Sequence, residues 1–137
     1  MTVSDHPAQD MLRAAPVLVA EDEFIIALAL GEMLEDHGVV VVGPAGRLER
    51  AVTLAETAEI SLALLDVNLR GKPIFPVAEI LAARGIPFIF MTGYARADLP
   101  PRFADTPMLF KPFNYSTLVR VMAELASPRQ SVADDPG

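Results

Sequence analysis

The 137-residue chain contains no cysteine, which excludes disulfide bridges and thiolate metal sites. It has no run of lysine and arginine and carries a formal net charge of -7, so binding to the phosphate backbone of nucleic acid is not expected. Its uninterrupted apolar runs are too short to cross a bilayer, and no basic segment followed by an apolar one opens the chain. These absences predict a cytoplasmic protein with neither a nucleic-acid nor a membrane partner.

The chain does contain enough apolar material for one core, since 52% of its residues are hydrophobic, but it is too short for two ordinary domains. We therefore predict a single folded domain over residues 16–126. Residues 1–15 lack periodicity and are expected to form a disordered leader. The polar, proline-bearing residues 127–137 are expected to form a disordered tail.

The stretch at residues 61–66, SLALLD, is an apolar run of strand length that ends in the carboxylate of Asp66. Such a run is typical of a strand buried on both sides at the centre of a parallel sheet. Further strands are predicted at residues 16–20, 39–42, 86–91 and 108–110, and helices at residues 24–37, 48–57, 75–84 and after Asn114. The alternation predicts an α/β fold, a doubly wound five-stranded parallel sheet with helices on both faces.

Three connections are expected to be irregular. Residues 43–46, GPAG, favour a turn, and residues 67–73 favour a loop. The segment between Thr92 and residue 108 holds three prolines and should contain only a short or irregular helix.

Four of the five predicted strands end in polar side chains. Glu21 and Asp22 follow the first strand, Asp66 ends the third, Thr92 follows the fourth, and Lys111 follows the fifth. These ends meet at the edge of an open α/β sheet where ligands bind. Converging carboxylates repel one another unless they share a proton or a cation, and hard oxygen ligands suit Mg²⁺. A lysine and a hydroxyl beside them can contact phosphoryl oxygens.

Each of these features also has an ordinary explanation when taken alone. An acidic pair after a strand is usually a solvated helix N-terminus, and an isolated Asp, Thr-Gly or Lys-Pro commonly forms a turn or loop. The functional hypothesis depends on their joint order, with each group at its own strand end.

In this order the residues resemble the receiver domains of two-component response regulators, over about residues 17–125. The resemblance implies a flavodoxin-like fold with strand order 2-1-3-4-5 and Asp66 as the phosphoacceptor. It also implies that Glu21, Asp22, Asp66 and the backbone carbonyl of Asn68 hold Mg²⁺. The phosphodonor would be a histidine kinase or a histidine phosphotransfer protein, and the downstream partner a protein that the sequence does not identify.

The resemblance further implies that Thr92 and Lys111 contact the phosphoryl group, and that the proline after the lysine, Pro112, follows a cis bond. Residues 90–94, FMTGY, are similar to the FATGY-type signature of a subgroup of often stand-alone receivers. One departure concerns Met108, which stands where most receivers carry a tyrosine or phenylalanine three residues before the lysine. Tyr94 is the alternative candidate for that switch residue.

Three other functions are alternatives to a non-enzymatic signalling receiver. A phosphohydrolase with an Asp nucleophile would resemble haloacid-dehalogenase phosphatases, but these carry a second Asp where this chain has Asn68. A flavin or nucleotide binder would need a phosphate-binding loop, and no GxxxxGK motif occurs. A pseudo-receiver that only binds protein would be expected to have lost one of the acids, and none is lost.

The first predicted helix carries more apolar residues than its core face needs. At 100° per residue, five of its side chains share one arc, the expected core face: Ile26, Leu30, Met33, Leu34 and His37. Phe24, Ile25 and Leu28 project away from that arc. They are ordinary exposed apolar residues, or residues that the leader covers, or a docking patch for the phosphodonor.

Overall fold

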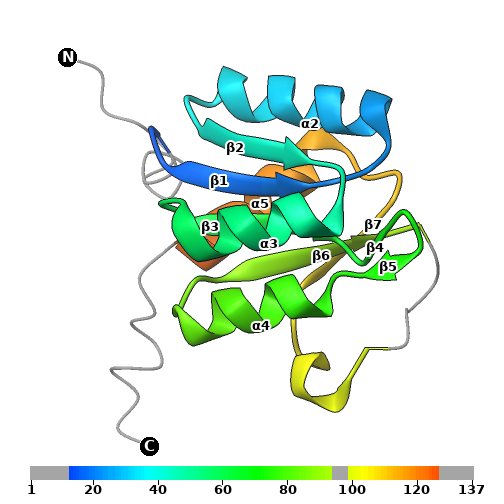
Figure 1. Ribbon diagram of the computed structural model, residues 1–137. Helices are drawn as coiled ribbons and strands as arrows, with labels where there is room; N and C mark the ends of the chain where they lie inside the picture. Colours follow the sequence, from blue (N-terminus) through cyan, green and yellow to red (C-terminus); the bar gives the residue numbers. More distant parts are fainter. Residues whose placement is uncertain (1–12, 94–98, 127–137) are drawn as a thin grey trace, which may run out of the picture.

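The computed structural model describes residues 13–93 and 99–126. Within these residues the strands form one five-stranded parallel sheet in the order β2-β1-β3-β6-β7 and a separate two-stranded sheet, β4-β5 (Figure 1). The five parallel strands are β1 (Pro16–Ala20), β2 (Val40–Ala45), β3 (Leu62–Asp66), β6 (Phe88–Thr92) and β7 (Met108–Phe110). Their order corresponds to 2-1-3-4-5, which confirms the predicted fold class. Most of the predicted leader and all of the predicted tail lie outside the described residues.

Helices cover both faces of the sheet. They are α2 (Phe24–Asp36), α3 (Leu48–Thr57), α4 (Phe75–Ala83) and α5 (Tyr115–Ala126). Figure 1 shows α3 and α4 in front of the sheet, with α5 behind it and α2 above β2. Among the described residues, no helix is long and apolar enough to span a membrane.

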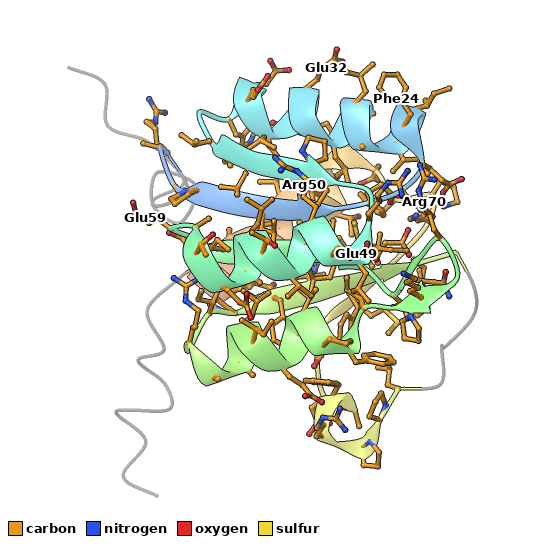
Figure 2. The ribbon with its side chains drawn as sticks, viewed as in Figure 1. Phe24, Glu32, Glu49, Arg50, Glu59 and Arg70 are labelled. Carbon is orange, nitrogen blue, oxygen red and sulfur yellow. The ribbon has the colours of Figure 1, made fainter. Side chains whose placement is uncertain are left out.

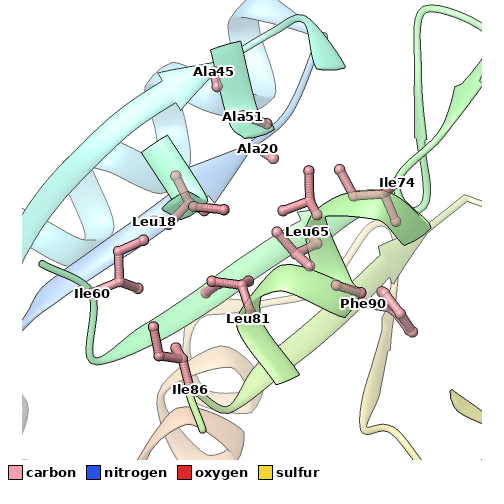
Figure 3. Packing of buried hydrophobic residues seen from close by; sticks show 14 of the residues in the cluster. Leu18, Ala20, Ala45, Ala51, Ile60, Leu65, Ile74, Leu81, Ile86 and Phe90 are labelled. Atoms are coloured by element: carbon pink, nitrogen blue, oxygen red, sulfur yellow. The ribbon is translucent and has the colours of Figure 1, made fainter. Parts of the chain in front are cut away.

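The two helical layers create two cores, because successive residues of a strand point to opposite faces. On the central strand, Ala63 and Leu65 belong to the core under α3 and α4, and Leu62 and Leu64 to the core under α2 and α5. All four are at most 2% exposed. Figure 3 shows the first core, where side chains of the sheet meet those of α3 and α4. This two-sided burial explains why the strand sequence is apolar at every position.

The predicted ends of the helices mostly agree with the structure, but the predicted core face of the first helix is only partly right. Leu30 and Leu34 are buried, as expected, together with Ala27. Three predicted members of this face are only half-buried: Ile26, Met33 and His37. The His37 ring follows the end of α2 and packs edge-on against the ring of Tyr115, 4.8 Å away.

The prediction of a turn at residues 43–46 was wrong, since β2 continues through Ala45. The Gly43–Pro44 bond is cis, and the pairing with β1 shifts register between Leu18 and Ala20. A proline without an N–H is tolerated here because β2 is an edge strand. The extra length lets the Ala45 carbonyl accept a hydrogen bond from the Glu21 N–H at 2.9 Å.

The predicted loop at residues 67–73 is instead a short hairpin, formed by β4 (Asn68–Leu69) and β5 (Lys72–Pro73). Between Thr92 and β7, the described residues contain only a short 3-10 helix, η1 (Pro101–Phe103). This agrees with the expectation drawn from the prolines. Phe103 of η1 packs among Phe75, Phe88 and Phe90.

The central strand should dominate stability. Leu64 of β3 is fully buried, so Leu64→Ala is expected to lower the free energy of unfolding by about 2–5 kcal/mol through lost burial and a cavity. Leu28 on α2 is 51% exposed, so the same substitution there should cost less than about 0.5 kcal/mol. Urea denaturation of the two variants measures both values, and equal losses would contradict this account of the core.

Candidate functional site

The polar groups predicted at the strand ends lie at one edge of the sheet. Glu21 and Asp22 directly follow β1, Asp66 is the last residue of β3, Thr92 is the last residue of β6, and Lys111 directly follows β7. These strands are parallel neighbours, which brings their carboxyl ends together. Glu21, Asp66 and Thr92 are 2%, 7% and 3% exposed, so the site is largely withdrawn from water.

Carboxylate oxygens of Glu21, Asp22 and Asp66 all lie within 4.8 Å of one another. The Glu21 side chain is held by the main chain two residues further on, because its Oε2 accepts a hydrogen bond from the Glu23 N–H at 3.0 Å. The carbonyl of Ala45 fixes the main chain of Glu21 at the same point. The end of β2 thus helps to orient a side chain that follows β1.

The β4-β5 hairpin holds the other two carboxylates. Asp66 Oδ1 accepts a hydrogen bond from the Asn68 N–H at 3.0 Å, and Asp22 Oδ2 accepts one from the Arg70 N–H at 2.8 Å. The main chain of Asn68 therefore lies beside Asp66, while the metal-binding role of its carbonyl stays a prediction. Sequence reasoning missed Arg70, because only the turn geometry brings its N–H to Asp22.

Lys111 is the cation of the site. Its Nζ lies 2.7 Å from Glu21 Oε1, 2.7 Å from Asp66 Oδ2 and 3.3 Å from Glu23 Oε1. The N–H of Lys111 donates to the Thr92 carbonyl at 2.8 Å, which fixes the main chain of the lysine next to β6. The following Lys111–Pro112 bond is cis. Glu23 was another member that sequence reasoning missed, although it adjoins the acidic pair in the run EDE.

Burial and charge set the protonation of the site. Desolvation raises the pKa of Glu21 to about 7, and the nearby ammonium of Lys111 only partly offsets it. Burial lowers the pKa of Lys111, but the hydrogen bond to Asp66 and the negative charges of Asp66 and Glu21 outweigh this effect, so the pKa is raised. The ammonium of Lys111 therefore stays charged and faces more negative charge than it can balance.

The donor set fits a small divalent cation. Hard carboxylate oxygens are the ligands that Mg²⁺ and similar ions prefer. Glu21 Oε1 is buried and, despite its short contact with Lys111, has no partner at hydrogen-bond geometry. An ion at Glu21, Asp22 and Asp66 would offset the charge that the single lysine leaves uncompensated.

The three residues predicted as a docking patch are exposed, with Phe24 at 76%, Ile25 at 78% and Leu28 at 51%. Figure 2 shows Phe24 on α2 at the same end of the molecule as Arg70. The patch is split between two grooves. Ile25 lines one of about 480 Å³ that also contains Lys111, and Phe24 and Leu28 line another of about 330 Å³ between α2 and β2.

Residues 17–123 match the family model described as the response regulator receiver domain. The chain is 38% identical over 129 residues to the transcriptional regulatory protein PdtaR of Mycobacterium tuberculosis, a match covering 90% of this chain and 62% of PdtaR. It is 30% identical over 128 residues to the phyllosphere-induced regulator PhyR of Methylorubrum extorquens, covering 90% of this chain and 47% of PhyR. The chain thus spans less than two thirds of the length of either curated relative.

A solved structure gives a similar result at the level of the fold. The solution structure of SdrG from Sphingomonas melonis Fr1 superposes with a TM-score of 0.74 and 40% sequence identity. That match covers 82% of this chain and 97% of SdrG. The resemblance stated from the residues alone agrees with all of these comparisons.

The raised pKa of Glu21 predicts a pH dependence of stability. The folded protein binds the Glu21 proton more tightly than the unfolded chain, so in EDTA the free energy of unfolding should fall as the pH rises from about 4.5 to about 7. Glu21→Gln should remove this part of the slope, on the order of 2–3 kcal/mol. Urea denaturation at pH 5 and pH 7.5 measures it, and identical slopes for both proteins would refute the assignment.

Proposed function

The chain belongs to the response regulator receiver domain family, and on that premise we propose that it accepts a phosphoryl group on Asp66 and signals by protein-protein contact. The observation that carries the proposal is the position of Lys111 Nζ, 2.7 Å from both Glu21 and Asp66 beside a cluster of three carboxylates. This arrangement places the positive charge of Lys111 directly beside the Asp66 carboxylate, at the edge of the sheet. The donor would be a histidine kinase or a histidine phosphotransfer protein.

In the proposed reaction, a carboxylate oxygen of Asp66 attacks the phosphorus of a phosphohistidine. The new O–P bond forms as the P–N bond breaks, and the imidazole leaves with the electron pair of that bond and takes a proton from solvent. Lys111 is within reach of the phosphoryl oxygens because it already contacts Asp66. Hydrolysis by water later releases inorganic phosphate and restores the carboxylate.

Glu21, Asp22 and Asp66, with the Asn68 carbonyl, would hold Mg²⁺ in this proposal. The bound ion would neutralise charge on the carboxylates and the phosphoryl oxygens, which otherwise repel each other. The Thr92 hydroxyl, at the end of β6, would donate a hydrogen bond to a phosphoryl oxygen. These roles suit transfer to and stabilisation of an aspartyl phosphate rather than turnover of a substrate.

Transmission of the signal would begin at the packing of β7. Met108 is half-buried against the core under α3 and α4, and it pairs with Phe90 across the strands. A methionine has no ring to turn, but its flexible side chain can repack when Thr92 moves. Tyr94, the alternative switch residue, lies outside the described residues.

The groove that contains Lys111 is the proposed docking surface for the phosphodonor. It lies between α2 and the connection from β7 to α5, and Ile25, Met33 and Phe113 line it. A donor helix laid along this groove would approach Asp66 from the side of Lys111. The docking role of Phe24 and Leu28, in the other groove, is proposed to be smaller.

Asp66→Asn should abolish labelling by acetyl phosphate in Mg²⁺, because an amide oxygen is too weak a nucleophile to displace the donor. The aspartyl phosphate, measured by Phos-tag electrophoresis and mass spectrometry, should be absent from this variant. EDTA should suppress labelling of the wild-type chain to the same level. The proposal fails if labelling survives either change.

Two substitutions at exposed apolar residues of α2 separate docking from chemistry. Ile25→Glu should slow transfer from a phosphorylated histidine phosphotransfer protein about tenfold or more, since it places a buried charge in the contact. Leu28→Glu, in the other groove, should slow it less. Rapid-quench measurements give both rates. Labelling by acetyl phosphate should be unchanged in both variants, and a parallel loss with that small donor would show a structural effect instead.

A further inference from the structure

The β4-β5 hairpin has a turn that its sequence does not favour. Strand β4 pairs antiparallel with β5, with Leu69 opposite Lys72, so Arg70 and Gly71 form a two-residue turn. Both have positive φ values, 52° for Arg70 and 85° for Gly71. Such turns prefer asparagine or glycine at the first of these positions, because other side chains crowd the backbone there. The arginine is therefore held in this conformation by its surroundings.

Two hydrogen bonds to side chains, in addition to the main-chain ladder, hold the turn. The Gly71 N–H donates to Asn68 Oδ1 at 2.7 Å, and the Arg70 N–H donates to Asp22 Oδ2 at 2.8 Å. Leu69 is fully buried and anchors the hairpin in the core. An exposed ion pair of 2.9 Å between Lys72 and Glu49 ties the hairpin to α3. The contact with Asp22 is the one that reaches the acidic cluster.

The same hairpin thus restrains two carboxylates that follow different strands. It starts at Asn68, whose N–H holds Asp66, and it turns at Arg70, whose N–H holds Asp22. Hydrogen bonds to carboxylate ligands fix the direction of their oxygens and strengthen metal binding. In Figure 1 the hairpin lies beside the carboxyl ends of the central strands, and in Figure 2 Arg70 lies at that edge.

We propose that Arg70 is a positioning residue, whose left-handed backbone aims its N–H at Asp22 and thereby sets the affinity of the carboxylate cluster for Mg²⁺. The role belongs to the main chain at this position and not to the guanidinium group. The proposal rests on the proposed function, since it concerns the ion that this function requires.

A pair of substitutions separates the backbone from the side chain. Arg70→Gly and Arg70→Val both remove the guanidinium, but glycine adopts positive φ freely whereas a β-branched residue strongly resists it. Lys72→Ala is the control for charge, because it removes one positive charge from the same hairpin outside the turn. Asn68→Ala is a second way to loosen the turn, since it removes the acceptor for the Gly71 N–H.

Isothermal titration with Mg²⁺ should give a dissociation constant about tenfold higher for Arg70→Val than for Arg70→Gly. The dissociation constants of Arg70→Gly and Lys72→Ala should agree within about twofold. Asn68→Ala should raise the dissociation constant as Arg70→Val does. In metal-free wild-type protein, the Arg70 amide proton should resonate downfield, and Asp22→Ala should move it upfield. Thermal denaturation of each variant shows whether the fold is retained.

Equal Mg²⁺ affinity of Arg70→Val and Arg70→Gly would overturn the proposal while leaving phosphorylation of Asp66 intact. A loss of the same size in all the hairpin variants, Lys72→Ala included, would also overturn it, because net charge alone would then explain the effect. If Arg70→Val does not fold, Asn68→Ala and the Arg70 amide resonance decide the matter. A wild-type chain that bound no Mg²⁺ would refute both this proposal and the proposed function.

Discussion

The ion pairs of Lys111 connect the end of β7 to the ends of β1 and β3, two strands with which β7 forms no ladder. Its ammonium group contacts Glu21 after β1 and Asp66 at the end of β3, while its own main chain is bound to the end of β6. Without this cation, Glu21 would be a buried carboxylate with no charge partner, which is among the most destabilising arrangements in a protein interior. The lysine does not balance the cluster fully. The remaining negative charge is what a cation at this site would offset.

The fold was predictable where burial acts on every residue of an element. The strand that ends at Asp66 has no polar face because helices cover both of its sides. Its continuous apolar sequence therefore indicates a buried strand without knowledge of which elements pack against it. Residues 43–46 show where such reasoning fails. Gly43 and Pro44 favour a turn locally, but edge position and pairing with β1 keep them in a strand. No property of those residues alone distinguishes the two outcomes.

The part of the site that could be predicted consists of side chains that stand at or just after the end of a predicted strand. The sequence places Glu21, Asp66 and Lys111 at the carboxyl ends of strands in one parallel sheet, so the topology brings them to the same edge. The contribution of Arg70 could not be found in this way, because it acts through a main-chain N–H and depends on a positive φ. Residue type says little about where a backbone amide points. Main-chain groups that hold the site's side chains can therefore be identified only from the structure.

Pro44 and the register shift on β2 also bear on association between copies of the protein. The outer strands of the sheet, β2 and β7, expose main-chain groups that can template the addition of a foreign strand. On β2 the proline removes one donor and the register shift distorts the ladder, while β7 is only three residues long. Both edge strands are therefore poor templates for a foreign strand. The irregularity that helps to place Glu21 thereby also protects the protein against edge-to-edge aggregation.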